Sequence, residues 1–327
     1  MKAIHVTQYG SPEVLQVVEV PEPKPSPRQA LIDIKVTGYN FHDAATRQGI
    51  FPDPPIPVPF IPGVEAAGIV EAIGDEVTEV KVGDRVAFNV EGADTYAEKS
   101  VVNSDRLVPI PDDISFEVAA SLTAQGGTTH YLMNEFRTIE PGVTLLIQAG
   151  ASGMGLLLTQ WAKHLGAKVM TTVSNEAKAQ AVREAGADEV ILYTQTDFVQ
   201  EVKRLTEGKG VDIVIDGVGT TLAGSLEAVK TRGLVITYGK AGGEPELMNP
   251  FNLLYRSRTL AGSDYFDFVA ERDDLLRRTL AAFDGYREGW LKPTIARVLP
   301  LEEARYAHEL MRDRNLIGKI LLTQEGA

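Results

Sequence analysis

The 327-residue chain is long enough for about two domains at roughly 100 to 200 residues each. Its hydrophobic content of 44% and charged content of 24% are typical of a folded globular protein and exclude a disordered, collagen-like or coiled-coil chain. The net charge is −13, and no basic run is long enough to follow a phosphate backbone, so nucleic acid is not expected as the main partner. The chain has no cysteine, which excludes disulfides, thiolate nucleophiles, iron–sulfur clusters and cysteine-ligated zinc.

The first residues favour a strand over an export signal. Residues 1–8 lack the basic segment and following apolar segment of such a signal, and no stretch reaches about 18 uninterrupted apolar residues. We therefore expect a cytoplasmic protein that has no membrane partner.

Residues 1–125 predict an irregular β-rich domain. Short alternating or β-branched runs occur at residues 30–36, 67–73 and 85–88, and proline and glycine separate them. Residues 52–62 are rich in proline, but strands resume directly after them, so this segment is interpreted as a loop inside the domain.

Residues 126–260 predict a doubly wound α/β domain, because apolar strands alternate with helical patterns. The five expected strands are residues 144–148, 168–173, 189–193, 211–216 and 234–238. The expected helices are residues 156–165, 176–184, 198–206 and 222–229. Two further helices, near residues 272–286 and 301–312, precede a last strand at 318–323, which either extends this sheet or returns to the first domain.

A glycine-rich turn follows the first strand of the α/β domain and leads directly into a helix. Its residues are Gly150, Ser152, Gly153, Met154 and Gly155, with Ser152 at the place expected for the middle glycine of the dinucleotide motif. Such a turn allows backbone N–H groups to approach a pyrophosphate at the positive end of a helix. Alone it would also be compatible with an ordinary strand–helix turn, but within five alternating units it predicts cofactor binding.

The end of the second strand indicates which dinucleotide is bound. An Asp or Glu about 20 residues after the glycines would bind the ribose 2′-hydroxyl of NADH, and Ser174 stands there instead. Lys178 and Tyr193 lie nearby in the predicted fold, so this corner can accept a 2′-phosphate and NADPH is preferred over NADH. Against this interpretation, Glu176 adds a negative charge, and Lys178 could be an ordinary solvated helix residue.

The motifs together resemble the medium-chain dehydrogenase/reductase superfamily, specifically its zinc-independent, zeta-crystallin-like quinone oxidoreductase branch. The resemblance spans nearly the whole chain and is carried by residues 38–43, 62–68, 82–86, 149–155, 160–163 and 318–319. It implies a Rossmann nucleotide domain, residues 126–260, inserted in a GroES-like β-rich substrate domain formed by residues 1–125 and completed by 261–327.

The resemblance also implies that the protein works without zinc. Zinc-dependent members have a cysteine where Asn40 falls and Gly-His-Glu where this chain has Gly63-Val64-Glu65. His42 and Asp43 are adjacent in the sequence, but one histidine and one carboxylate do not make a tetrahedral zinc site. No metal is therefore expected.

Carried over by position, the resemblance places Asn40 beside the nicotinamide ribose and the substrate, and Thr128 against the nicotinamide carboxamide. Ser174, Lys178 and Tyr193 match the positions that hold the 2′-phosphate in members that use NADPH. Four further residues follow predicted strands, where a dinucleotide crosses the sheet edge: Gly217, Tyr238, Gly239 and Lys240.

The predicted chemistry is hydride transfer to a small apolar conjugated acceptor. Related reductases often have a tyrosine where this chain has Phe51, so a phenolic proton donor is absent there. Without a metal or an evident acid, simple ketones lack an electrophile, whereas quinones and α,β-unsaturated carbonyls need less help. We hypothesise that NADPH meets such an acceptor in the interdomain cleft, where Asn40 orients the acceptor and Phe41, Phe51 and Phe60 wall it.

Two alternatives remain open from the sequence. An alkenal or enoyl-thioester (ene) reductase would use the same cofactor, although the missing tyrosine argues against a tyrosine-assisted mechanism. A non-catalytic NADPH-binding structural protein is the second alternative. The resemblance also implies a homodimer, formed through an edge strand of the nucleotide sheet.

Overall fold

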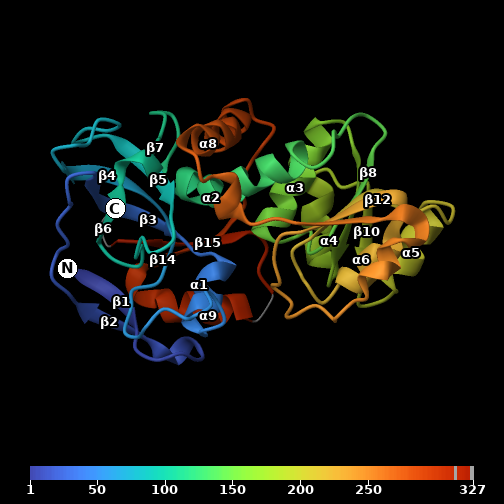
Figure 1. Ribbon diagram of the computed structural model, residues 1–327, viewed down its shortest axis with the longest axis horizontal. Coiled ribbons are helices and arrows are strands. Elements are labelled where there is room, and N and C mark those ends of the chain that lie inside the picture. The colour runs from blue at the N-terminus through green and yellow to red at the C-terminus, as the bar shows by residue number, and fades with distance from the viewer. Residues whose placement is uncertain (313–314, 325–327) are drawn as a thin grey trace. The chain divides into compact units, whose positions relative to one another are not determined.

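The computed structural model describes residues 1–312 and 315–324, and the chain folds into two compact units (Figure 1). The first unit contains Met1–Gly127, Ala270–Phe283 and the segment from Ile295 onward. The second contains Thr128–Val269 and Asp284–Thr294. The domain boundaries expected from the sequence stay a prediction, and residues 313–314 and 325–327 of the expected return segment lie outside the described residues.

A seven-stranded sheet forms the first unit. In spatial order its strands are β14 (Ile295–Pro300), β15 (Lys319–Thr323), β3 (Gln29–Gly38), β4 (Glu65–Ile73), β5 (Arg85–Asn89) and β7 (Val108–Pro109), with β6 (Lys99–Asn103) also paired to β3. Ala30, Ile32 and Ile34 alternate along β3 and pack in one buried cluster with Phe88 of β5. The two-residue period of the apolar side chains thus explains why this segment is a strand.

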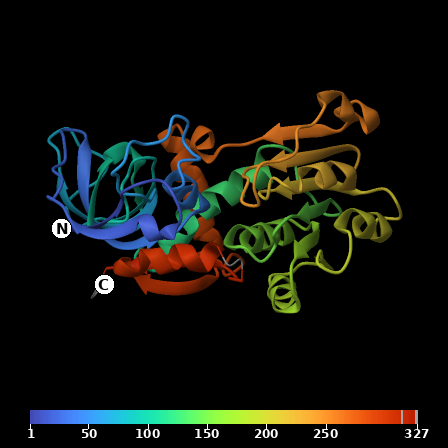
Figure 2. The same ribbon diagram turned by 90° about the horizontal axis from the view of Figure 1, so that it is seen from below.

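The last strand returns to the sheet of the first unit. β15 pairs antiparallel with β3, so that Leu321 lies opposite Gly38, and β14 pairs parallel with β15. Figure 2 shows the red C-terminal segment alongside the blue N-terminal segment. Of the two arrangements left open by the sequence pattern, the structure therefore has the one that the family resemblance implies.

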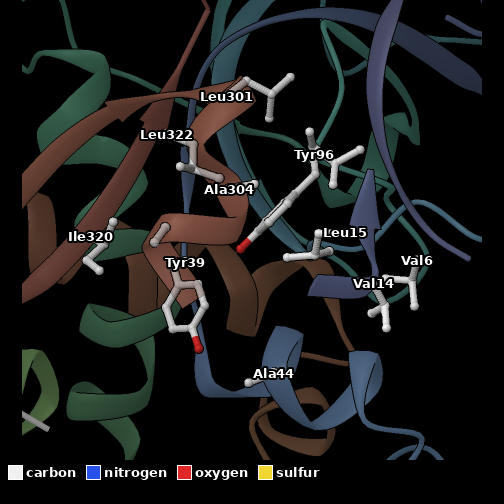
Figure 3. Packing of buried hydrophobic residues seen from close by; sticks show 12 residues of the cluster. Val6, Val14, Leu15, Tyr39, Ala44, Tyr96, Leu301, Ala304, Ile320 and Leu322 are labelled. Carbon is white, nitrogen blue, oxygen red and sulfur yellow. The ribbon is translucent and has the colours of Figure 1, made fainter. Parts of the chain in front are cut away.

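A second core in the first unit lies between the N-terminal hairpin and two helices. The other elements of this unit are β1 (Lys2–Val6), β2 (Leu15–Glu19), α1 (Phe41–Arg47), α8 (Arg272–Arg287) as far as Phe283, α9 (Ala304–Arg312) and three 3₁₀ turns, Pro12–Val14, Ser104–Arg106 and Leu301–Glu303. Tyr39 and Tyr96 lie among the apolar side chains of this core (Figure 3). Each tyrosine brings a hydroxyl group into a buried environment.

Helix α2 (Phe116–Asn134) contains the point at which the chain passes from the first unit into the second. This helix is not among the elements predicted from the sequence. Residues 119–123 are consecutive and all buried, so the helix has no exposed polar stripe and shows no amphipathic period. Within the β-rich domain expected for residues 1–125, the segment from Phe116 onward is helical.

The second unit is a six-stranded parallel sheet. Its strands follow the order β10 (Glu189–Leu192), β9 (Lys168–Val173), β8 (Thr144–Ile147), β11 (Val211–Asp216), β12 (Val229–Thr237) and β13 (Thr259–Gly262). Its helices are α3 (Gly153–His164), α4 (Glu176–Glu184), α5 (Phe198–Leu205), α6 (Leu222–Ala228) and α7 (Tyr265–Phe268), with 3₁₀ turns Pro250–Leu253 and Tyr255–Ser257. This is the spatial order of a doubly wound dinucleotide-binding fold.

All five strands predicted for this sheet are present, and β13 is an additional sixth strand. β13 has only four residues and none of them is buried, so its sequence carries no clear strand signal. β12 starts at Val229, earlier than expected, because residues 229–233 also extend beside β11. No helix in the described part of the chain has the length and apolar character required to cross a membrane.

Candidate active site

The predicted cofactor residues of the second unit lie at one edge of its sheet. All strands of a parallel sheet end at the same edge, and a dinucleotide binds beyond those ends. These residues come after strands in the chain: Gly150 and Ser152, followed by Gly153, Met154 and Gly155 at the start of α3, come after β8, Ser174 after β9, Tyr193 after β10, Gly217 after β11, and Tyr238, Gly239 and Lys240 after β12. The fold therefore places residues that are distant in the sequence along a single edge.

The glycine-rich turn is closed by a serine cap. The Gly155 N–H donates to Ser152 Oγ at 3.0 Å, so Ser152 acts as the N-cap of α3 at the place where a glycine was expected. A Cβ on Gly150 would lie 1.7 Å from Thr171 Oγ1, and one on Gly155 would lie 2.5 Å from the Ala149 carbonyl oxygen. Both glycines are therefore required by close packing, and the start of α3 presents backbone N–H groups suited to a phosphate.

A buried polar chain, which the sequence pattern did not reveal, connects the loops at this edge. Thr172 Oγ1 donates to Gln148 Oε1 at 2.7 Å, and Gln148 Nε2 donates to Ser225 Oγ at 3.1 Å. Ser225 Oγ in turn donates to Asp216 Oδ2 at 2.7 Å. Asp216 also accepts two backbone N–H groups from the turn after β11. Polar residues at the ends of apolar strands were the available signal for this network.

The predicted 2′-phosphate corner combines a hydroxyl group with nearby cationic and aromatic side chains. Ser174 is half-buried directly after β9, and Tyr193, with its side chain 53% exposed, follows the adjacent strand β10. Lys178 lies in the first turn of α4. The carboxylate of Glu176, which argued against a phosphate here, pairs with Arg183 at 2.5 Å. Its charge is thus balanced within the fold.

The remaining predicted cofactor residues of the second unit range from tightly packed to exposed. A Cβ on Gly217 would lie 2.5 Å from the Tyr238 ring, so glycine allows that ring to cover the turn. Burial raises the pKa of the Tyr238 phenol. Lys240 pairs with the exposed Glu244 at 2.5 Å, and Thr128 is half-buried in α2.

In the first unit, Asn40 belongs to a closed triangle of polar side chains at the start of α1. Asn40 Nδ2 donates to Glu65 Oε2 at 2.8 Å and to the Gly38 carbonyl at 3.2 Å. Lys319 Nζ donates to Asn40 Oδ1 at 3.2 Å and to Glu65 Oε2 at 2.5 Å. The Ala124 N–H donates to Glu65 Oε1 at 2.6 Å. The side chains of Lys319 and Glu65 are 1% and 0% exposed, so this is a buried ion pair.

A second buried polar chain begins three residues further along α1. The Asn40 N–H and the Tyr96 hydroxyl both donate to Asp43 Oδ2, at 2.9 and 3.2 Å. Arg47 Nε donates to His308 Nδ1 at 3.2 Å, so His308 Nε2 carries the proton and donates to the Tyr96 oxygen, also at 3.2 Å. Burial raises the pKa of Asp43 to about 7, and burial with the Arg47 charge lowers the pKa of His308 to about 3.

The three predicted aromatic residues lie in the same unit, close to α1 in the sequence. Phe41 is the first residue of α1 and is 47% exposed. Phe51 is half-buried, and its ring contacts the ring of His42 with centroids 5.2 Å apart. Phe60 is held by two backbone hydrogen bonds with Val6 and packs against the second core.

Comparison with known proteins identifies the family. The model of the alcohol dehydrogenase GroES-like domain matches residues 26–112, and that of zinc-binding dehydrogenases matches residues 153–280. Quinone oxidoreductase of Salmonella typhimurium is 35% identical over 328 residues, which cover 98% of each chain. The chain belongs to the zinc-independent quinone oxidoreductase branch of the medium-chain dehydrogenase/reductase superfamily. The family resemblance inferred from the motifs is therefore confirmed.

Two further members of this family are similar over nearly the whole chain. A 2-haloacrylate reductase from a Burkholderia species is 34% identical over 320 residues, which cover 96% of each chain. The crystal structure of Escherichia coli quinone oxidoreductase complexed with NADPH has a TM-score of 0.94 and 34% identity, and the match covers 99% of this chain and 100% of that chain. The Rossmann and GroES-like fold class is thereby confirmed.

In this family member the donor set around Asn40 does not fit zinc. An amide is a poor zinc ligand, and the Lys319 ammonium already contacts both Asn40 and Glu65, where it would repel a divalent cation. Within residues 1–312 and 315–324, no three or more His, Cys, Asp or Glu side chains are grouped so that they could hold a metal ion. The positive charge next to the Glu65 carboxylate is that of the Lys319 ammonium.

Proposed function

We propose that this protein is an NADPH-dependent, zinc-independent oxidoreductase that transfers hydride to quinones or related conjugated carbonyl acceptors. The proposal rests on two features at the carboxyl ends of the parallel strands. The serine-capped glycine turn follows β8, and Ser174 follows β9 at the position where an enzyme that uses NADH would have an acidic residue. The match to the E. coli relative covers 99% of this chain, and that protein was crystallised in complex with NADPH. When bound, NADPH supplies the hydride.

The residues of the second unit would hold the cofactor. The N–H groups of Gly153 and Met154 at the start of α3 suit the pyrophosphate, and Gly155 keeps the turn closed through its hydrogen bond to Ser152. Ser174, Lys178 and Tyr193 suit the 2′-phosphate. The remaining proposed contacts come from Thr128, Gly150, Ser152, Gly217, Tyr238, Gly239 and Lys240. This assignment accounts for the hydroxyl residue Ser174 directly after β9, and the nearby Glu176 pairs with Arg183.

On the acceptor side we propose Asn40 together with Phe41, Phe51 and Phe60. Three phenyl rings suit a flat apolar molecule, and a quinone spreads the added charge onto an oxygen without a metal ion. The quinone oxidoreductase relative from Salmonella supports this acceptor class.

A second candidate function is reduction of an activated carbon–carbon double bond. It is favoured by the Burkholderia relative, a 2-haloacrylate reductase that matches 96% of this chain. It uses the same cofactor residues, so only the acceptor distinguishes the two functions.

The test is oxidation of NADPH, with NADH in parallel, in the presence of 1,4-benzoquinone, 9,10-phenanthrenequinone, a 2-enal and a 2-haloacrylate. The proposal predicts turnover of quinones with selectivity for NADPH. Turnover of the alkenes alone would establish the second candidate, and turnover with NADH alone would contradict the proposed role of Ser174, Lys178 and Tyr193. Tight NADPH binding without any turnover would indicate a non-catalytic protein.

We also propose that the protein is a homodimer that associates through the second unit. The side chains of Leu247, Phe251, Leu254 and Tyr255 are each at least 69% exposed and lie just before β13, which is an end strand of the sheet. An exposed apolar group beside an open strand edge is typical of an interface. Analytical ultracentrifugation should give a dimer, and Phe251→Lys should shift it towards the monomer; a monomeric parent protein would refute the proposal.

A further inference from the structure

The amide group of Asn40 has a defined orientation because its two ends face opposite charges. The Lys319 ammonium must meet an acceptor, and the Glu65 carboxylate must meet a donor. Rotation of the amide by a half-turn would direct its NH₂ group at the ammonium and its oxygen at the carboxylate. The ion pair therefore decides which way Asn40 points.

In this orientation the Asn40 side chain can accept a further hydrogen bond but cannot donate one. Both Nδ2 protons are used within the fold, by Glu65 Oε2 and the Gly38 carbonyl. Oδ1 accepts one proton from Lys319 and has a second lone pair on the side of the capping box that Asn40 forms with Asp43, whose N–H donates to the Asn40 carbonyl at 3.0 Å. Asn40 is half-buried, whereas the side chains of Lys319 and Glu65 are closed to solvent.

The backbone around the triangle is built to keep these two charges in place. A Cβ on Gly38 would lie 2.8 Å from Glu65 Oε2 and 2.9 Å from Lys319 Cε, so only glycine leaves room for the pair. The Ala124 N–H holds the other carboxylate oxygen, so that Oε2 alone faces Asn40 and Lys319. The carboxylate therefore cannot turn away from Asn40 without losing a buried hydrogen bond.

We propose that Lys319, paired with Glu65, is a positioning residue that makes Asn40 a hydrogen-bond acceptor for a hydroxyl group of the bound reactants. The inference deepens the proposed function and rests on it for the identity of these reactants. A quinone carbonyl cannot donate to Asn40. The donor is instead a hydroxyl group, which NADPH carries on its ribose and a hydroquinone product carries on its ring. Asn40 thus recognises a hydroxyl group and does not polarise the acceptor carbonyl.

The decisive variant is the double substitution Glu65→Gln with Lys319→Met. The introduced glutamine keeps its oxygen on the Ala124 N–H, which turns its NH₂ group towards Asn40. Asn40 then either directs its NH₂ group at this NH₂ group or, if it flips, directs its oxygen at the Gly38 carbonyl oxygen, so neither orientation satisfies all partners and the outward place of its oxygen is no longer fixed. The variant removes both buried charges together, so the fold is not left with an isolated one. Lys99→Met with Glu71→Gln is the matched control, since this ion pair of 2.9 Å lies in the same unit, is partly exposed and does not contact Asn40.

The first measurement uses the protein without ligand. In the ¹H–¹⁵N spectrum the side-chain amide of Asn40, assigned by its absence in Asn40→Ala, should exchange slowly with water in the parent protein and in the control. In the Glu65→Gln/Lys319→Met variant it should exchange faster. Rapid exchange in the parent protein would overturn the inference, because the hydrogen-bonded triangle would not exist.

The second measurement separates the two sources of the hydroxyl group. NADPH affinity is determined by calorimetry, and product inhibition is determined with the hydroquinone of the best quinone. We expect the double variant to weaken one of these by about tenfold, while its unfolding temperature stays close to that of the control. Weaker NADPH binding assigns the ribose hydroxyl, and weaker product inhibition assigns the hydroquinone. If the double variant is folded and both quantities are unchanged, the inference is wrong. If the parent protein reduces no acceptor, the proposed function fails, yet the exchange and NADPH measurements still decide the orientation of Asn40.

Discussion

Two groups of the buried chain that runs from Arg47 through His308 and Tyr96 to Asp43 should each make the stability of the protein depend on pH. Burial raises the pKa of Asp43 from 3.8 to about 7 and lowers the pKa of His308 from 6.5 to about 3. The folded protein therefore binds more protons at Asp43, and fewer at His308, than the unfolded chain does. Each difference makes the free energy of unfolding depend on pH.

The two effects have opposite signs. The contribution of Asp43 is greatest below pH 3.8 and is lost as the pH rises to about 7, because the folded state favours the protonated carboxyl. The contribution of His308 is present above pH 6.5 and is lost as the pH falls towards 3, because the folded state favours the neutral ring. Between pH 4 and 6.5 each slope has a magnitude of about 1.4 kcal/mol per pH unit, and the slopes nearly cancel.

Asp43→Asn and His308→Gln separate the two contributions. Glutamine can accept from Arg47 and donate to Tyr96, and asparagine can accept the two hydrogen bonds of Asp43 Oδ2, so both changes preserve the chain. Free energies of unfolding from urea titrations should be measured for both variants and the parent protein from pH 4 to 8. Relative to the parent, Asp43→Asn should gain stability as the pH rises, and His308→Gln should lose it up to pH 6.5. Curves parallel to that of the parent would refute the reasoning.

Three further predictions concern the buried ion pair and the cofactor edge. Lys319→Met should lower the free energy of unfolding by about 3 to 5 kcal/mol, because it leaves the Glu65 charge buried without its partner. Adding Glu65→Gln should restore most of the lost stability. An unfolding temperature of Lys319→Met within experimental error of the parent would contradict this prediction. Gly150→Ala should abolish NADPH binding measured by fluorescence, because its Cβ would meet Thr171 Oγ1 at 1.7 Å, and undiminished affinity would show that the turn can shift. Ser174→Asp should weaken NADPH binding at least about tenfold and favour NADH, because an acid at this place repels the 2′-phosphate. Ser174→Ala should change the ratio of NADPH affinity to NADH affinity less.

Local patterns account for what could be predicted in the second unit. Apolar strands alternate there with helices that have their own caps and end signals, so each element is visible within its own segment of sequence. The glycine turn was identified from its place between an apolar strand and a helix, whereas the contact that requires a glycine at position 150 is made by Thr171 of the neighbouring strand. β13 and α2 were missed, because β13 is too short and too exposed to show a period and α2 is buried over consecutive residues.

The first unit shows the limit of such local reasoning. Asn40 could be singled out from its position in a motif, and Lys319 from the Gly-Lys pair at the start of the last strand. That Lys319 orients the Asn40 amide through Glu65 follows only from β15 pairing beside β3, because 279 residues separate Lys319 from Asn40.

The sequence by itself determined the α/β character of the second unit, the dinucleotide cofactor and the absence of cysteine-based zinc chemistry, since these depend on periodicity, on the glycine turn with Ser174 beyond it, and on composition; the GroES-like first domain followed from the motifs shared with the family. Only the tertiary structure decided the charge and hydrogen-bonding state of the polar groups. The raised pKa of Asp43 and the direction of the Asn40 amide arise from burial and from partners on distant strands. Burial and opposing charge are properties of the assembled unit, and no single segment of the chain contains them.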